Sequence, residues 1–159
     1  MSGINHGANL GNDVTYSGTV SAAMEGTAFN VPSIAFSQVG GRPTSDFSIA
    51  ASFALKVAAH VLAHGLPPDS LLNVNFPRHP DPEKYVWGML GKRRYGEVVD
   101  ARVDPRGRKY YWIGGDEIGH EDRPGSDCNQ IAEGYITLSP VHMDLTNHQA
   151  LARLKDVRF

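Results

Sequence analysis

Two segments with helical periodicity alternate with two short apolar segments between residues 17 and 76, and this alternation restricts the fold more than any other feature. A helix is expected to begin near Ser17, and a second helix, capped by Asp46, is expected over residues 46–62. Residues 31–37 and 71–76 are expected to form buried strands. The core-facing positions are predicted to be Val20, Ala23, Met24 and Thr27 in the first helix and Phe47, Ala50, Ala51, Phe53, Ala54, Val57, Ala58, Val61 and Leu62 in the second. The order loop, helix, strand, helix, strand is typical of a parallel α/β sheet, so the predicted fold class is α/β.

The pattern changes after about residue 82. Strands are predicted over residues 85–94, 108–113 and 135–139, a surface loop over residues 114–127, and an amphipathic helix over residues 146–157. We therefore expect residues 1–80 to form an α/β core with a phosphate-binding loop. Residues 81–159 are expected to form a β-rich extension with a C-terminal helix that serves oligomerisation.

Charge and composition exclude several classes of partner. The net charge of −2 gives no strong attraction to nucleic acid polymers, and no apolar run approaches the roughly 20 residues that span a membrane. Any phosphate must therefore be held by local dipoles and a metal rather than by a basic surface. The single cysteine, Cys128, excludes an intramolecular disulfide, which favours a cytoplasmic location.

The segment from Ser2 to Thr19 carries the main chemical signal. Its glycines allow a close backbone approach to a ligand, and its asparagines, Asn5, Asn9 and Asn12, carry amide oxygens that suit a hard cation. Ser17, Gly18 and Thr19 stand at the expected start of a helix, where unpaired N–H groups and the helix dipole favour a phosphate. The alternative is that Ser17 and Thr19 only cap the helix and that the asparagines only form turns.

Residues 2–26, which include Gly-Ile-Asn-His-Gly-Ala-Asn-Leu-Gly and Tyr-Ser-Gly-Thr-Val-Ser-Ala-Ala-Met-Glu-Gly, resemble the signature segment of the SurE family of survival-protein nucleotidases. Further motifs of similar kind follow in order at residues 32–37, 72–77, 104–107, 111–114, 125–127, 134–140 and 144–146. The resemblance implies a Rossmann-like α/β/α three-layer core, only part of which lies in this chain, with a C-terminal β-hairpin extension.

By the same resemblance, the expected function is a phosphoester hydrolase that acts on nucleoside monophosphates, a 5'-nucleotidase that depends on Mg²⁺ or Mn²⁺. Asn5 matches the asparagine that ligates the metal, and Ser17, Gly18, Thr19 and Asn9 match the residues around the phosphate. The other expected ligands, two adjacent aspartates and a serine, would lie upstream of this segment. The catalytic acidic residues are therefore expected to be missing, and the chain alone is expected to be weakly active or inactive. The other expectation is a non-catalytic phosphate- or nucleotide-binding or structural subunit, and a homo-oligomer is expected.

Other residues have a functional and a simpler interpretation. His6 is either a proton donor to the leaving group or a solvated loop residue, and His60 with His64 favours a helix surface over a metal site. Arg93, Arg94 and Arg106 are either nucleotide contacts or solvated surface residues, and residues 110–112 favour a hairpin or subunit contact over stacking on a base. Residues 40–42 and 124–126 are candidates for the border of a pocket.

Overall fold

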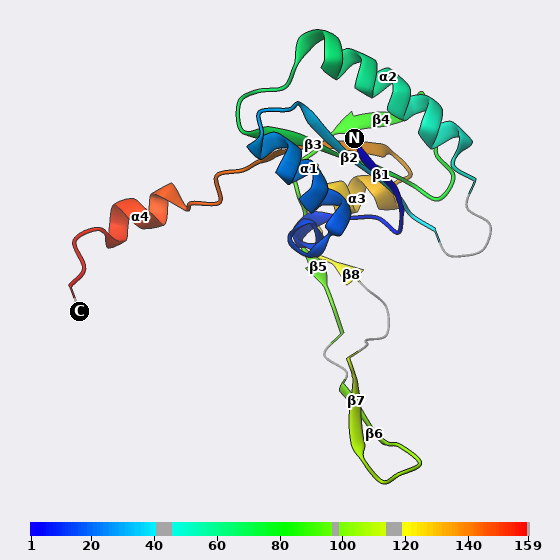
Figure 1. Ribbon diagram of the computed structural model, residues 1–159, viewed down its shortest axis with the longest axis vertical. Helices are drawn as coiled ribbons and strands as arrows, with labels where there is room; N and C mark the ends of the chain where they lie inside the picture. The colour runs from blue at the N-terminus through cyan, green and yellow to red at the C-terminus, as the bar shows by residue number, and fades with distance from the viewer. Residues whose placement is uncertain (41–45, 97–98, 114–118, 159) are drawn as a thin grey trace.

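A mixed five-stranded sheet forms the centre of the molecule. The computed structural model describes residues 1–40, 46–96, 99–113 and 119–158 (Figure 1). The strand order is β1-β2-β3-β9-β4, so β1 and β4 lie at the two edges. The bounds are Ser2–His6 for β1, Ser33–Gln38 for β2, Ser70–Phe76 for β3, Tyr85–Trp87 for β4 and Ile136–His142 for β9. Strands β1, β2 and β3 run parallel, whereas β9 runs antiparallel to β3 and parallel to β4.

Helices cover both faces of this sheet. Helix α2 (Ser48–His64) lies over one face, and α1 (Gly18–Ala28) and α3 (Asp127–Ala132) lie over the other (Figure 1). The alternation of side chains along β3 explains the two layers, because Leu72, Val74 and Phe76 pack under α2 while Leu71 packs under α1. The three-layer α/β/α arrangement of the predicted fold class is therefore confirmed.

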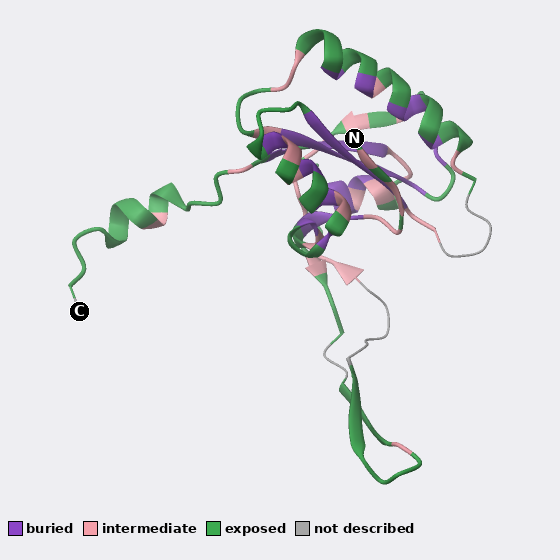
Figure 2. Ribbon diagram, in the orientation of Figure 1, coloured by how far each residue is buried: buried purple, intermediate pink, exposed green. Residues whose placement is uncertain are grey.

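The second half of the chain contributes both to this sheet and to two projecting parts. The hairpin of β6 (Val99–Val103) and β7 (Lys109–Ile113) extends away from the sheet, with the small pair β5 (Arg93–Arg94) and β8 (Gly119–His120) at its base (Figure 1). Helix α4 (His148–Leu154) lies at the end of an extended segment. Figure 2 shows both projecting parts almost entirely exposed. No helix among the described residues has the length and apolar character needed to cross a membrane.

Most of the expected elements are present. Helix α1 begins directly after Ser17, Asn147 caps α4, and the Asp46 carboxylate accepts a 2.9 Å hydrogen bond from the Ser48 N–H at the start of α2. The hairpin extension is also present at the expected place. The parallel order is confirmed for β1, β2 and β3, whereas the strand predicted over residues 135–139 is the antiparallel β9.

Three local predictions were wrong, and a fourth, the division at residue 80, stays a prediction. The glycine-rich segment is not all loop, because residues 2–6 pair with β2 as strand β1. The loop expected over residues 114–127 ends in buried residues that begin α3, although residues 114–118 lie outside the described part of the chain. Leu62 is 84% exposed and Ala51 is exposed, because both lie on the solvent side of α2. The division at residue 80 stays a prediction, and β4 and β9 extend the same sheet as β1, β2 and β3.

Candidate functional site

A row of polar side chains crosses the sheet at the carboxyl ends of its parallel strands. The strand register pairs Asn5 of β1 with Ser37 of β2, and Ser37 with Asn75 of β3. Ser37 and Asn75 are fully buried on the face that carries α1. In open α/β sheets, ligands bind outside the carboxyl ends of the strands, so this row lies where a site is expected.

Asn9 joins the glycine-rich loop to this polar row through four hydrogen bonds. Its backbone N–H donates to Oδ1 of Asn75 over 2.8 Å, and its carbonyl accepts from Nδ2 of Asn73 over 2.9 Å and of Asn75 over 3.0 Å. Its side-chain Nδ2 donates to Oγ of Ser37 over 2.7 Å. An amide nitrogen carries two hydrogens, so one donor of Asn9 remains for a ligand.

The carboxylate of Asp127 fixes the next part of the loop. One oxygen accepts a 2.9 Å hydrogen bond from the Gly11 N–H, and the other accepts a 2.7 Å bond from the Gly91 N–H. Asp127 is fully buried at the start of α3, where a negative charge is favoured by the helix dipole. The loop after β1 and the segment after β4 are thus held against the same side chain.

Ser17 caps helix α1 beside this loop. Its Oγ accepts a 3.1 Å hydrogen bond from the Val20 N–H, so one of the unpaired N–H groups of the first turn is used by the cap. A Cβ atom on Gly18 would meet nothing within 4 Å, so the space above the first helical residue is open. The N–H groups of Gly18 and Thr19 have no carbonyl partner inside the helix, and the hydroxyl proton of Ser17 is still available to a ligand.

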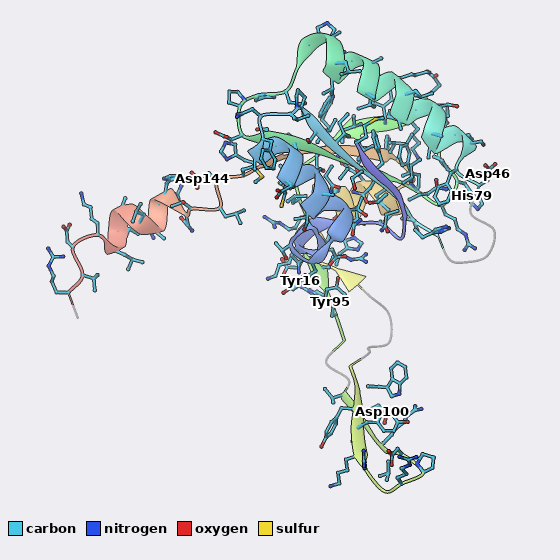
Figure 3. All side chains as sticks on the ribbon, in the orientation of Figure 1. Tyr16, Asp46, His79, Tyr95, Asp100 and Asp144 are labelled. Atoms are coloured by element: carbon cyan, nitrogen blue, oxygen red, sulfur yellow. The ribbon has the colours of Figure 1, made fainter. Side chains whose placement is uncertain are left out.

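A cavity of about 520 Å³ lies at this helix start. It is lined by Asn9, Asn12, Asp13, Tyr16, Ser17 and Tyr95. Figure 3 shows Tyr16 and Tyr95 close together at this end of the molecule, beneath the start of α1. The structure therefore brings the predicted phosphate residues Ser17 and Asn9 to one cavity, with Gly18 and Thr19 directly after Ser17 in the chain.

A network of charged and polar groups forms one side of the cavity. The Asp13 carboxylate accepts a 2.9 Å hydrogen bond from Nε of Arg93 and a second hydrogen bond from the hydroxyl of Tyr95. The Arg93 N–H donates to Oδ1 of Asn12 over 2.8 Å. Burial and the bond to Asp13 raise the pKa of the Tyr95 hydroxyl, which therefore stays protonated as a donor.

Asn5 lies at the end of β1 but does not line this cavity. Its Nδ2 donates to the Gly7 carbonyl over 2.8 Å, which leaves its Oδ1 as a possible cation ligand. Among the described residues, no group of three or more His, Cys, Asp or Glu side chains could hold a metal. One amide oxygen fits a hard cation, but the residues described in the structure do not complete a cation site.

The other candidate residues lie in several places. The His6 ring packs edge-on against Phe47, with 4.7 Å between centroids, and His60 stacks on His64 on the exposed side of α2. Arg106 and residues 110–112 are exposed on the hairpin, and Arg94 is exposed in β5. Gly40 lines a second cavity of about 320 Å³ with Arg93 and Cys128, whereas residues 41 and 42 lie outside the described part of the chain. Ser126 is the buried cap of α3.

Comparisons with known proteins agree on one family. The family model described as "Survival protein SurE" matches residues 1–97. The chain belongs to the SurE family. The chain is 51% identical over 155 residues to the 5'-nucleotidase SurE of Myxococcus xanthus strain DK1622, which covers 97% of this chain and 59% of that protein. It is 50% identical over 162 residues to the 5'-nucleotidase SurE of Geotalea uraniireducens strain Rf4, covering 98% of this chain and 63% of that protein.

A solved SurE structure has the same fold. The crystal structure of the SurE protein from Aquifex aeolicus superposes with a TM-score of 0.81 at 42% sequence identity, and covers 96% of this chain and 62% of that one. The chain thus spans about 60% of the length of the SurE proteins that it matches.

Several residues that shape the site were not predicted from the sequence. Asp13, Tyr16 and Tyr95 line the cavity, and Asp127 fixes two loops from a segment that was interpreted as surface. Two signals were present in the sequence. Asn73 and Asn75 alternate with apolar residues in a buried strand, which indicates a polar stripe on one sheet face. Ser126 followed by Asp127 is typical of a helix start.

Proposed function

We propose that the chain forms the phosphate-binding part of a divalent-metal-dependent 5'-nucleotidase that hydrolyses nucleoside monophosphates. The observation that carries the proposal is the meeting of the α1 helix start and the Asn9 loop at one cavity, in a chain of the SurE family. The cavity volume of about 520 Å³ falls in the range typical of small-molecule sites. The SurE relatives named above are called 5'-nucleotidases, which favours an enzyme over a non-catalytic binding or structural subunit.

The residues of the loop and helix start divide the binding of the phosphoryl group. The N–H groups of Gly18 and Thr19 and the hydroxyl of Ser17 donate hydrogen bonds to phosphoryl oxygens, aided by the positive end of the α1 dipole. The free hydrogen of the Asn9 amide donates a further hydrogen bond to the phosphoryl group. Because Asn9 is bonded to both β2 and β3, these donors keep their positions as charge develops on the phosphoryl oxygens.

The metal would be held in part by Asn5, through its Oδ1. A divalent cation, when bound, supplies positive charge to the phosphoryl oxygens and lowers the pKa of water. Mg²⁺ and Mn²⁺ prefer carboxylate ligands, which the described residues do not gather into a cluster. We assign the missing carboxylate ligands to a part of a longer protein, in keeping with the partial span of the SurE relatives.

Self-association and cytoplasmic location belong to the same proposal. Exposed apolar side chains gather on the hairpin and around α4, and they support a homo-oligomer: Val99, Val103, Tyr110, Tyr111, Trp112, Leu145, Leu151 and Leu154. The only cysteine, Cys128, is a buried free thiol, which suits a reducing compartment.

The decisive experiment compares the 159-residue chain alone with a fusion that adds the remaining portion of a SurE relative. Both are assayed with p-nitrophenyl phosphate and a panel of nucleoside monophosphates in Mg²⁺ or Mn²⁺. We expect metal-dependent turnover from the fusion and little from the chain alone. Robust turnover by the chain alone would show that its own residues complete the metal site, and an inactive, folded fusion would contradict the nucleotidase proposal.

A further inference from the structure

The cavity at the start of α1 has aromatic walls that phosphate binding does not use. Two of its six lining residues are tyrosines, Tyr16 and Tyr95. Tyr16 is 87% exposed and Tyr95 is 52% exposed, so a large part of each side chain is open to solvent. Exposed rings beside a phosphate cradle suit a ligand with an aromatic portion, because stacking buries apolar surface on both partners.

Tyr95 is held in a fixed position. Its hydroxyl donates to the Asp13 carboxylate, and the same carboxylate accepts the 2.9 Å bond from Nε of Arg93. The Arg93 backbone N–H bonds to Asn12, which ties this segment to the η1 turn (Gly11–Tyr16). A ring anchored at its tip loses little conformational entropy when a ligand stacks on it.

Tyr16 also lines this cavity, next to the phosphate cradle. It directly precedes Ser17, whose hydroxyl caps α1, and consecutive Cα atoms lie about 3.8 Å apart. A ligand whose phosphate is held at Ser17 therefore has Tyr16 and Tyr95 within reach of the group attached to that phosphate (Figure 3).

The charge of the cavity also suits such a ligand. Asp13 is the only carboxylate among the described lining residues, and Arg93 neutralises it as an ion pair. Its remaining lining groups are neutral amides, a hydroxyl and the two tyrosines. The part of the cavity around Tyr16 and Tyr95 therefore carries no net charge that would repel a phosphate or draw it away from Ser17.

We propose that Tyr16 and Tyr95 form a nucleobase shelf, on which the base of a nucleoside monophosphate stacks while its phosphate lies at Ser17. The inference rests on the proposed phosphate site and adds a determinant of specificity to it. The shelf favours nucleotides over phosphoesters that lack an aromatic group. Stacking is tolerant of base identity, so purine and pyrimidine nucleotides are both accepted.

The test measures binding to the 159-residue chain by proton NMR titration with three probes. Adenosine 5'-monophosphate carries a base, ribose 5-phosphate carries only the sugar, and inorganic phosphate carries neither. We expect adenosine 5'-monophosphate to bind about tenfold more tightly than ribose 5-phosphate, the ratio that one stacked base typically supplies. Stacking also moves the adenine H2 and H8 resonances upfield.

The variants separate the ring from its anchor. Tyr95→Ala and Tyr16→Ala are each expected to remove most of the tenfold difference without changing the affinity for ribose 5-phosphate, which also confirms that the variants are folded. Tyr95→Phe keeps the ring but loses the hydrogen bond to Asp13, so its affinity for adenosine 5'-monophosphate is expected to fall by only about two- to threefold. Tyr110→Ala, which removes an exposed tyrosine of the hairpin, is the matched control and should change nothing.

Two results would overturn the shelf alone. One is equal binding of adenosine 5'-monophosphate and ribose 5-phosphate by the unaltered chain, and the other is an equal loss for both probes in Tyr95→Ala. Two other results would show that the phosphate site itself is wrong. One is that ribose 5-phosphate and inorganic phosphate do not bind to the unaltered chain. The other is that they bind to Ser17→Asp with unchanged affinity. Either outcome would remove the shelf together with the proposed function.

Discussion

The Asp127 carboxylate and the Gly11 N–H are 116 positions apart in the sequence and 2.9 Å apart in the structure. The second oxygen of Asp127 accepts from the Gly91 N–H over 2.7 Å. One buried side chain therefore joins the loop after β1, the segment after β4 and the start of α3. Losing it should loosen the cavity as well as the fold.

Asp127→Asn is expected to lower the free energy of unfolding by about 2 kcal/mol or more. The amide keeps one acceptor oxygen, but its NH₂ group then faces a backbone N–H that has lost its partner. Urea titration followed by circular dichroism measures the change. Asp100→Asn on the exposed hairpin is the control, with an expected effect below about 1 kcal/mol. Equal stability of the Asp127→Asn and Asp100→Asn variants would mean that Asp127 does not hold these loops.

Gly91→Ala should destabilise the same junction by about 1–3 kcal/mol. A Cβ atom on Gly91 would lie 2.7 Å from Sγ of Cys128 and 3.0 Å from Oδ1 of Asp127, so both must move. Gly119→Ala is the matched control, because a Cβ atom there meets nothing within 4 Å. The midpoints of thermal unfolding compare the two, and a Gly91→Ala midpoint that equals that of Gly119→Ala would contradict the close packing described here.

Two substitutions of Ser17 separate helix capping from phosphate binding. Ser17→Ala removes the acceptor for the Val20 N–H and should cost about 1 kcal/mol of stability while weakening phosphate binding. Ser17→Asp keeps a good cap, so stability should be retained, but its charge repels the ligand and phosphate binding should be lost. Inorganic phosphate titrations combined with thermal unfolding check both.

Asn147→Ala removes the cap of α4, which lies away from the cavity, and serves as the control for capping. Its phosphate affinity should equal that of the unaltered chain. If Ser17→Asp binds phosphate normally, Ser17 acts only as a cap.

Asn5→Ala is expected to reduce metal affinity about tenfold or more in an active fusion protein, because it removes one oxygen ligand, and losing even a residue that orients a metal ligand typically costs about 10- to 100-fold. The activity measured against Mn²⁺ concentration reports the change. His6→Ala alters the next residue, whose ring packs against Phe47, and should leave the metal titration unchanged. An unchanged titration for Asn5→Ala would remove Asn5 from the metal site.

We expect the stability of the fold to depend on pH through the thiol of Cys128. Burial, followed by the nearby Asp127 charge, raises the pKa of its thiol from 9.0 to about 12. Above pH 9 the unfolded thiol loses its proton while the folded one keeps it, so stability should fall as the pH rises from 9 to 12. Urea titrations at several pH values should show this decline, and Cys128→Ala should reduce it. A decline of equal size in Cys128→Ala would assign it to other groups.

The sequence predicted elements whose patterns are repeated and local. The helix from Ser17 and the strand at residues 71–76 follow directly from apolar spacing. Strand β1 was missed because glycine and asparagine have low strand propensity, and residues 2–6 extend only because β2 offers a parallel partner. Helix α3 was missed because it has six residues and a largely polar sequence.

The residues of the candidate site likewise fall into those that a local motif predicted and those that it did not. Ser17 and Asn9 were found from a local motif, and the structure brings both to one cavity, while their role at a phosphate stays a prediction. Tyr95 and Asp13 were missed because their contact spans 82 positions and depends on how the segment after β5 folds back. Sequence spacing carries no information about such a meeting.

The Asn9 side and the Tyr95 side of the cavity should differ in their tolerance of substitutions, because Asn9 makes four hydrogen bonds to the central strands. A substitution on the Asn9 side disturbs two central strands at once, so that side should accept few replacements. The Tyr95 side is tied to the loop through Asp13 and Asn12, and to β8 through the β5–β8 pair, which lies outside the five-stranded sheet. Attempts to redirect the protein to new phosphoesters by directed evolution should therefore find their useful mutations around Tyr95 and leave Asn9 untouched.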